Sequence, residues 1–323
     1  MINSDALRNE WHVVYRSHSL REGDVRPIRL LGQDLVIWRS SGKAVAWLDL
    51  CIHRGARLSL GQVVDNELVC PYHGWRYNLE GTCTLIPAQP KAPIPTRACA
   101  QTYACQEKNG FIWVCLGEPN SEVPDHPEWN DSNFLKVFTG PYEFRASAPR
   151  AVENVIDVSH FPFVHDSMLG QAGEPDEIED YIVDRTNDGL HAGPIVVSQP
   201  AGDHRRMPVQ STYRFWIPRP FMPYLMKSLD EERCFSHFMP VTPVEDDVSL
   251  MWVLTSANFD KEDGEERISA RNDDVFGEDV PIVNSQRPAM MPEALRQELH
   301  VRADKLSVVY RRWLAELGIP GAQ

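Results

Sequence analysis

Two short loops, each with one cysteine and one histidine, constrain this chain more than any other feature. Cys51 and His53 lie in CIHRGARLSLG, and after sixteen intervening residues Cys70 and His73 lie in CPYHGWRYNLEG. A zinc finger usually takes its cysteines from one pair and its histidines from another. Two mixed pairs suit an asymmetric [2Fe-2S] cluster, in which two histidines replace two cysteines on one iron. We therefore predict a one-electron carrier at these four residues, with structural zinc or a chance grouping as the alternatives.

Neighbouring residues support the cluster. Gly55 and Gly74 stand just after the candidate ligand histidines, where a tight loop needs a residue free of Cβ constraints. Tyr72 lies between the second cysteine and histidine, so its hydroxyl is a candidate hydrogen-bond donor near a cluster sulfur. Such a bond would tune the reduction potential of the cluster.

A second group of candidate ligands lies in AVENVIDVSHFPFVHDSMLG. On a helix, Asn154, Asp157 and His160 would share one broad face, because they are three residues apart. Pro162 disfavours a continuous helix from His160 to His165, and a kink or helix end there would turn His165 back beside His160. Two histidines and a carboxylate on one side of an iron leave positions open for substrate and dioxygen. Taken alone, the two histidines are more typical of ordinary buried or exposed residues, so this hypothesis depends on the cluster upstream.

Length and texture indicate two domains. The chain has 323 residues, more than the roughly 100 to 200 of a typical domain. Its first third alternates apolar and polar residues as short antiparallel strands do, and the polar, proline-containing stretch EPNSEVPDHPEWNDSNF follows. We therefore predict a boundary near residue 118, with one domain at 1–118 and the other at 119–323.

Composition excludes several classes of protein. The net charge of −14 argues against a nucleic-acid-binding role. The N-terminal MINSDALRNEWHVVY has no apolar run long enough for a signal peptide or a membrane span, so we expect neither. The remaining cysteines are scattered, which is typical of reduced, mostly buried thiols in a cytoplasmic protein rather than of a disulfide framework. These are Cys83, Cys99, Cys105, Cys115 and Cys234.

Together these motifs resemble the Rieske non-heme iron oxygenases. The resemblance includes CPYHGW, the Asn-x-x-Asp-x-x-His-x-x-x-x-His run, and GEDVPIVNSQRP followed by RADKLSVVYRRWL, so it spans nearly the whole chain. Membrane-bound Rieske subunits carry an extra cysteine in each loop, where this chain has Ala56 and Tyr72. Within the family the chain is most similar to short enzymes built of alpha subunits alone, such as caffeine-type N-demethylases, vanillate-type O-demethylases and saxitoxin-pathway hydroxylases.

The resemblance implies an α+β fold. Its parts are an N-terminal all-β Rieske [2Fe-2S] domain and a catalytic domain in which helices pack on an antiparallel sheet, of the helix-grip or START-like type. It also implies a mononuclear Fe(II) held by His160, His165 and a third ligand in the acidic pair Glu278-Asp279, which we expect to open a helix. We choose Asp279, although helix capping is another role open to an Asp before Val280-Pro281. The alternative third ligands are Asp274 and Asp304, of which Asp304 precedes a run with the spacing of a core-packed helix.

The resemblance assigns Asp157 to electron transfer. Its carboxylate would connect a Rieske histidine of one subunit, for which we choose His73, to an iron-ligand histidine of the next subunit. Asn154 would support the iron site without binding the metal. A buried salt bridge and a helix-surface amide are the structural alternatives for these two residues. The implied assembly is a head-to-tail homotrimer, because one subunit would hold its own cluster and iron too far apart.

The implied function is that of a monooxygenase. It would use O2 and electrons from a separate NAD(P)H-dependent reductase, directly or through a ferredoxin, to hydroxylate a C–H bond of a small polar or heterocyclic molecule. Hydroxylation of an N-methyl or O-methyl group releases formaldehyde, so hydroxylation and demethylation both stay open, as does the substrate. A ring cis-dihydroxylating dioxygenase is one alternative. An electron-transfer protein without oxygen chemistry is another.

The region from Met168 to Phe259 is expected to form most of the substrate pocket, as strands of an antiparallel sheet. His237 is a candidate hydrogen-bonding residue, and His204, Arg205 and Arg206 are candidates for a polar lid, with a solvated loop as the alternative. About one in three of the large aromatic and thioether side chains is expected to contact substrate. These are Met207, Tyr213, Phe215, Trp216, Phe238, Met251 and Trp252.

Overall fold

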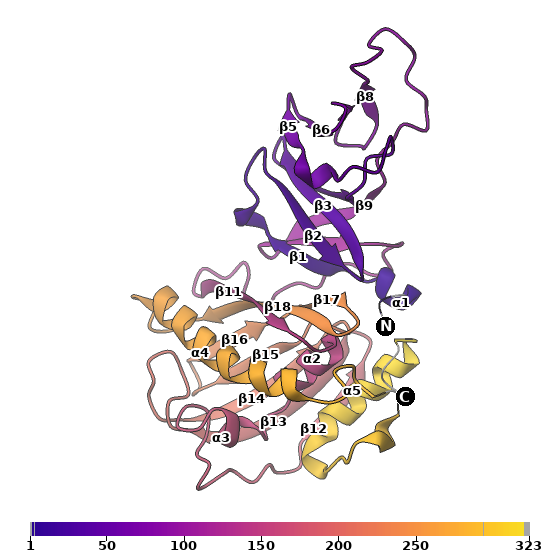
Figure 1. The fold of residues 1–323 in the computed structure, drawn as a ribbon. Helices are drawn as coiled ribbons and strands as arrows, with labels where there is room; N and C mark the ends of the chain where they lie inside the picture. Colours follow the sequence, from indigo (N-terminus) through magenta and orange to yellow (C-terminus); the bar gives the residue numbers. More distant parts are fainter. Residues whose placement is uncertain (1, 3, 293, 320–323) are drawn as a thin grey trace. The chain divides into compact units, whose positions relative to one another are not determined.

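The structure is a computed structural model, and it describes residues 2, 4–292 and 294–319. The chain forms two compact units that divide between Val123 and Pro124. This division lies inside the polar, proline-containing stretch that begins at residue 118. Figure 1 shows the first unit in indigo to magenta and the second in magenta to yellow.

The first unit contains a six-stranded antiparallel sheet in the order β1-β10-β9-β4-β3-β2. Two-residue turns at Leu31-Gly32 and Ser41-Gly42, all four residues with positive φ, join β2 to β3 and β3 to β4 as tight hairpins. A short helix, α1 (Asp5–Arg8), precedes the sheet. The strands are β1 (His12–Arg16), β2 (Val25–Leu30), β3 (Gln33–Ser40), β4 (Lys43–Leu48), β9 (Thr102–Lys108) and β10 (Phe111–Cys115).

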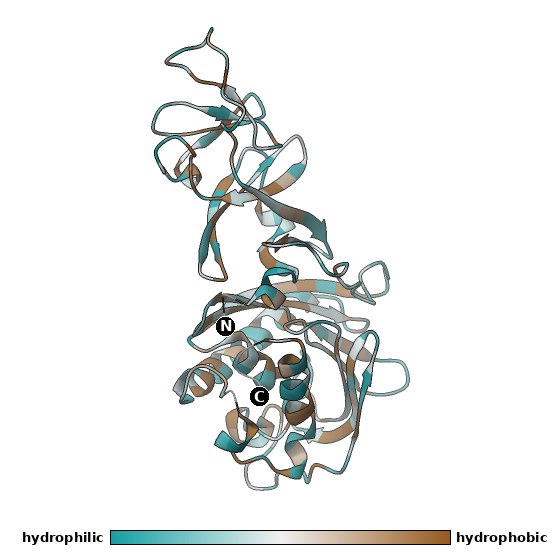
Figure 2. Ribbon diagram, turned by 90° about the vertical axis from the view of Figure 1, so that its right-hand side faces the viewer, coloured by the Kyte–Doolittle hydropathy of each residue, from teal (hydrophilic) through white to brown (hydrophobic). Residues whose placement is uncertain are grey.

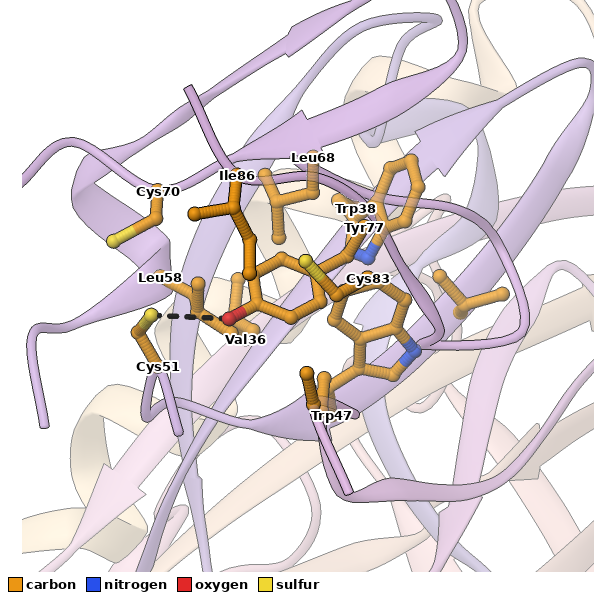
Figure 3. Close-up of a cluster of buried hydrophobic side chains, with 13 residues drawn as sticks. Val36, Trp38, Trp47, Cys51, Leu58, Leu68, Cys70, Tyr77, Cys83 and Ile86 are labelled. Carbon is orange, nitrogen blue, oxygen red and sulfur yellow. Dashed lines mark hydrogen bonds between the residues drawn. The ribbon is translucent and has the colours of Figure 1, made fainter. Parts of the chain in front are cut away.

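A smaller four-stranded sheet carries the two Cys/His loops. It consists of β5 (Gln62–Val64), β6 (Glu67–Val69), β7 (Arg76–Tyr77) and β8 (Cys83–Leu85), in that order. The first loop lies between β4 and β5, and the second connects β6 to β7. Both loops cover a buried aromatic cluster in which the rings of Trp38 and Trp47 meet edge to face at 5.0 Å (Figure 3). This packing gives the loops a rigid base.

The second unit is an eight-stranded antiparallel sheet with helices on one face (Figure 1). The strands pair in the order β11-β18-β16-β15-β14-β13-β12, and β17 pairs with β18. The predicted α+β class, with an all-β first part and a sheet-and-helix second part, is confirmed. The strands are β11 (Leu135–Phe144), β12 (Ile182–Thr186), β13 (Gly189–Gln199), β14 (Val209–Ile217), β15 (Tyr224–Ser228), β16 (Cys234–Phe238), β17 (Val241–Glu245) and β18 (Val248–Ala257), and the helices are α2 (Ala148–Ile156), α3 (Phe161–Val164), α4 (Gly264–Ser285) and α5 (Lys305–Glu316).

Strand residues alternate between the two faces of this sheet, as the period of a strand requires. In β14, Ser211, Tyr213, Phe215 and Ile217 are buried, while the residues between them keep exposed surface. Figure 2 shows the corresponding mixture of hydrophobic and hydrophilic residues along the strands. The alternation therefore decides which side chains of each strand are buried.

All seven cysteines are unpaired thiols. Of the five outside the Cys/His loops, Cys83 and Cys115 are buried, Cys105 and Cys234 are partly buried, and Cys99 is exposed. Among the described residues, none of the helices combines the length and the apolar character needed to cross a membrane.

Candidate metal centres

The two Cys/His loops have the same backbone conformation. In each, the cysteine N–H donates to the carbonyl of the residue five positions later at 2.8 Å, and the glycine N–H donates back to the cysteine carbonyl. Gly55 and Gly74 have φ of 71° and 70°, in the left-handed region that favours glycine. The repeated turn brings one thiol and one imidazole from each loop to the same place.

The four candidate ligands form one group. Cys51 and Cys70 are buried in the same apolar cluster, and the rings of His53 and His73 lie 4.5 Å apart between centroids. His53 Nδ1 is buried without a hydrogen-bond partner in the described part of the chain. A buried nitrogen without a partner beside two buried thiols fits a bound metal cluster, because such a nitrogen is otherwise costly. The donor set, two sulfurs and two imidazole nitrogens, is that of a Rieske [2Fe-2S] cluster.

A tyrosine hydroxyl contacts one candidate ligand thiol, but it belongs to Tyr77 rather than Tyr72. Tyr77 Oη lies 3.1 Å from Cys51 Sγ (Figure 3), and burial raises the pKa of Tyr77, so its proton stays available for donation. Tyr72 is 65% exposed, and its ring rests against His73. The sequence signal for Tyr77 was strand alternation, since Tyr77 is the inward-facing residue of β7.

The second group of candidate ligands spans two helices. The prediction of a continuous helical face through Asn154, Asp157 and His160 is wrong, because α2 ends before Asp157, which has extended backbone angles. A new short helix, α3, follows, with Pro162 in its first turn, where the missing N–H costs nothing. His160 and His165 flank this helix, and their rings lie 5.2 Å apart between centroids. Pro162 thus begins a helix, and the two histidines meet across it.

Asp279 completes this group. One of its carboxylate oxygens lies 3.4 Å from His160 Nε2 and 3.1 Å from His165 Nε2. The three ligand atoms all lie within 4.8 Å of one another. His165 Nε2 and Asp279 Oδ1 are buried and lack a well-formed hydrogen bond within the described residues. Two imidazoles and one carboxylate that converge in this way fit a mononuclear Fe(II) ion.

The local setting of Asp279 differs from the prediction. The prediction that the Glu278-Asp279 pair opens a helix is wrong, because α4 begins at Gly264 and Asp279 lies well inside it. The buried positions Ile268, Asn272, Phe276, Asp279 and Val283 follow one helical stripe that continues through the acidic pair. Asp279 is therefore not a helix cap.

The candidate iron-binding histidines are oriented by further carboxylates. His160 Nδ1 lies 3.2 Å from Asp157 Oδ2, and His165 Nδ1 lies 2.8 Å from Glu278 Oε2. Each imidazole thus directs Nε2 toward Asp279 and Nδ1 toward an acid, the arrangement that fixes the tautomer and orientation of metal-binding histidines. Sequence reasoning assigned no such role to Glu278.

These charges also determine protonation. Burial lowers the pKa of His160, but Asp157 and Asp279 outweigh it and raise that pKa to about 9. Burial raises the pKa of the Asp279 carboxyl, but the two imidazoles hold it well below its usual range. Asp279 is therefore an anion at neutral pH, as a metal ligand must be.

The alternative third ligands lie outside this group. Asp274 forms an exposed ion pair with Arg206. Asp304 accepts a hydrogen bond from the Val301 N–H at 2.8 Å just before α5. Neither carboxylate belongs to the converging set. Both have structural roles instead.

A cavity opens beside the three candidate iron ligands. Seven aromatic and methionine residues were candidates for the cavity wall, and the structure describes all of them. Tyr213 is the one that lines the cavity. The separate candidate His237 lines it as well. His204 is buried against Phe259 and Arg205 pairs with Asp203. The cavity is lined by Asn154, Val155, His160, Phe161, His165, Leu169, Tyr213, Leu225, Lys227, Phe235, His237, Met239, Arg271, Asn272, Val275, Phe276 and Asp279.

Sequence reasoning missed several of these lining residues, including Lys227, Arg271 and Asn272. Alternation in YLMKS gave a signal for Lys227, since it faces the same side as Leu225. On α4, Asn272 and Asp279 are seven residues apart and so lie on one face. This spacing indicates a shared helical face only when both residues are known to lie within one helix, and the sequence prediction did not place α4 there.

Comparison with known proteins agrees with both centres. The family model of the Rieske [2Fe-2S] domain matches residues 10–103, and that of the vanillate O-demethylase oxygenase C-terminal domain matches residues 144–318. The chain is 34% identical over 324 residues to methylxanthine N1-demethylase NdmA of Pseudomonas putida, covering 96% of this chain and 89% of that protein. The structure of Pseudomonas putida CBB5 NdmA with caffeine superposes with a TM-score of 0.86 at 31% identity, covering 98% of this chain and 92% of that one.

A further relative matches a smaller region. Over 116 residues the chain is 45% identical to oxidoreductase NdmD of Pseudomonas putida, a match that covers 35% of this chain and 20% of that protein. The two domain matches and the full-length similarity to NdmA determine the family. The chain belongs to the Rieske non-heme iron oxygenases, whose members carry a Rieske [2Fe-2S] cluster and a mononuclear iron.

Proposed function

We propose that this protein is a monooxygenase that uses O2 and externally supplied electrons to hydroxylate a C–H bond, including those of N-methyl or O-methyl groups. The observation that carries the proposal is the convergence of His160, His165 and Asp279 at one end of an apolar-walled cavity. The four candidate cluster ligands are a second feature that supports it, because the cluster they hold would deliver the electrons that oxygen chemistry needs. An electron-transfer protein would require the cluster but not this second group.

The proposal gives each group a role. Cys51, His53, Cys70 and His73 hold the [2Fe-2S] cluster. His160, His165 and Asp279 hold Fe(II), which, when bound, supplies the site where dioxygen is activated. All three residues line the cavity, so a metal held by them would face a substrate bound there.

Cavity residues control access and position. Phe161, Leu169 and Phe276 form apolar walls beside the candidate iron ligands, so they exclude water and pack against a ring. Asn154 lines the cavity and also the surface pocket that contains Asp157. In the proposal its amide supports the site and does not bind the metal.

Electron transfer between subunits is part of the proposal. His73 is exposed, and the exposed apolar residues Ile52 and Tyr72 neighbour the two candidate cluster histidines. In the second unit, Asp157 lies in a surface pocket with Leu299, which is 92% exposed. The exposed His73 beside the cluster ligands and the surface pocket around Asp157 beside the iron ligands support docking of His73 of one subunit against Asp157 of the next. A head-to-tail homotrimer closes such a contact.

The electron donor is proposed to be an NAD(P)H-dependent reductase, acting directly or through a ferredoxin. The similarity to part of oxidoreductase NdmD supports a redox partner of this kind. We place the enzyme in the cytoplasm, where NAD(P)H is available to that partner. Relatives named methylxanthine demethylases support a small heterocyclic substrate and formaldehyde as a product.

Iron content and product analysis test the proposal. The holoenzyme should contain about three irons per chain, two in the cluster and one mononuclear. His160→Ala with His165→Ala should lower this to about two without loss of the cluster absorption. An unchanged iron content would remove the oxygenase interpretation.

Turnover with a surrogate reductase and labelled dioxygen then identifies the reaction. One labelled atom in the product, or formaldehyde from a methylated substrate, supports the monooxygenase. Incorporation of both atoms into one ring product would instead identify a cis-dihydroxylating dioxygenase.

A further inference from the structure

Two buried basic side chains line the cavity, and the proposed function gives them no role. Lys227 on β15 is 3% exposed and Arg271 on α4 is 4% exposed. Both line the same cavity as the three candidate iron ligands. Lysine and arginine are rarely buried this completely unless they are paired with an anion.

Neither cation forms an ion pair with a carboxylate in the described part of the chain. The Lys227 ammonium donates to the Gly202 carbonyl, and the Arg271 guanidinium donates to the Ala201 and Gly202 carbonyls at 3.0 Å each. Asp203 attracts both cations, but its carboxylate is already held by Arg205. Neutral carbonyls accept these hydrogen bonds but supply no negative charge, so the protonated form of each side chain lacks a balancing anion.

Other cavity groups do not supply the missing negative charge. Among the described residues that line the cavity, Asp279 is the one carboxylate, and a bound ferrous ion would carry twice its charge. Burial lowers the pKa of His237 to about 3, so this imidazole is neutral. Burial lowers the pKa of Lys227 well below its usual range and lowers that of Arg271 too, because the charged form of each is poorly solvated there. An anion in the cavity would relieve this cost.

The cations and the iron ligands lie at different positions along one helix. Arg271 and Asp279 are eight residues apart on α4, about 12 Å along the helix axis. Phe276 lies between them and faces the cavity, and Leu225 and Met239 add apolar walls from the sheet side. A planar ring fits between such walls, with its polar substituent toward the cations.

We propose that the substrate is a small aromatic or heterocyclic acid whose carboxylate is bound by Lys227 and Arg271, while its ring places the reacting carbon beside His160, His165 and Asp279. The inference rests on the proposed function and specifies its substrate class. Arg271 has five N–H donors and Lys227 has three, so each keeps a donor for the carboxylate beyond its carbonyl bonds. Charge-assisted hydrogen bonds from two desolvated cations are strong, and they would select an acid over its neutral amide.

Calorimetric titration of the holoenzyme tests this without turnover. The probes are para-methoxybenzoate and its neutral counterpart para-methoxybenzamide, which share ring and methoxy group. We expect the acid to bind about tenfold or more tightly than the amide. Lys227→Met, which removes the charge and keeps an unbranched side chain, should weaken acid binding by about tenfold and leave amide binding within about twofold.

Lys261→Met is the matched control, because Lys261 is an exposed lysine whose loss changes the net charge equally. It should leave both affinities unchanged. Equal affinity of the wild-type protein for acid and amide, or no binding of the acid, would overturn the proposal. So would a folded Lys227→Met protein, checked by circular dichroism, with unchanged preference for the acid.

If Lys227→Met does not fold, the affinities of the wild-type protein for the acid and for the amide still test the proposal. Their comparison also separates this inference from the proposed function. If formaldehyde is released from neutral methylated compounds alone, the proposed monooxygenase function is supported and the proposed acidic substrate is rejected. Tight, charge-dependent binding of the acid without turnover would support the acid-binding site and reject the proposed monooxygenase function.

Discussion

The cluster site and the iron site of this chain use similar side chains but assemble them differently. The candidate cluster ligands all lie within residues 51–73, in two loops with the same internal hydrogen bonds. The candidate iron ligands combine residues 160 and 165, on either side of α3, with residue 279 in the interior of α4. The first site is therefore determined by local turns, and the second depends on how α4 packs in the second unit.

This difference predicts that the two sites can be separated by mutation. Asp279→Ala removes the one ligand contributed by α4, so the mononuclear iron should be lost and product formation should fall below detection. The cluster should keep its absorption and electron paramagnetic resonance spectra, because its ligands come from the other unit. Metal analysis should show about one iron fewer per chain.

Asp274→Ala is the control for that change, since it removes another carboxylate of α4 that pairs with Arg206 at the surface. It should keep full iron content and near-normal activity. Loss of the cluster in Asp279→Ala would contradict the independence of the two sites.

Asp157→Asn tests the proposed connection between the sites. Asp157 contacts His160 Nδ1 at 3.2 Å without belonging to the converging ligand set, so iron should be largely retained. Activity should fall about 10- to 100-fold, the usual effect of losing a carboxylate that orients a metal-binding imidazole. In rapid mixing, the reduced cluster should be reoxidised more slowly by O2 and substrate.

The exposed Asp184 offers a matched control, because Asp184→Asn makes the same chemical change away from the site. Normal cluster reoxidation in Asp157→Asn would exclude the electron-transfer role and leave only a structural one.

The same contrast explains what the sequence could predict. The ligand loops were predictable because cysteine, histidine and glycine positions in a short turn determine one another. The meeting of His160 and His165 was predictable from Pro162, although the proline starts a helix rather than kinking one. The setting of Asp279 was not, because the boundaries of α4 depend on its packing against β11 and on a buried stripe that continues beyond Pro281 to Val283.

Cavity residues were the least predictable part. Aromatic and methionine side chains such as Phe215 and Met251 fill the core and do not line the cavity, whereas Lys227 does. Composition favours large apolar residues as pocket candidates, but strand register decides which face each one occupies. A buried lysine such as Lys227 can be identified as a cavity residue only when the register of its strand is known.

The smallest expected effect concerns the cluster site alone. Tyr77→Phe removes the hydroxyl that lies 3.1 Å from Cys51 Sγ and keeps the ring in its buried cluster. A hydrogen bond to a ligand sulfur stabilises the reduced, more negative cluster, so its loss should lower the reduction potential. A net hydrogen-bond contribution of about 1 kcal/mol corresponds to tens of millivolts for a one-electron couple.

Tyr72→Phe is the matched control for the Tyr77 substitution, because it removes the hydroxyl of the exposed tyrosine that rests against His73. Spectroelectrochemical titration should show a lower potential for Tyr77→Phe and a potential within a few millivolts, or about 0.1 kcal/mol, of wild type for Tyr72→Phe. A lower potential for Tyr72→Phe and an unchanged one for Tyr77→Phe would mean that Tyr72, between Cys70 and His73, donates the hydrogen bond to the cluster. That result would also mean that loop position, rather than the inward face of β7, determines which tyrosine tunes the cluster.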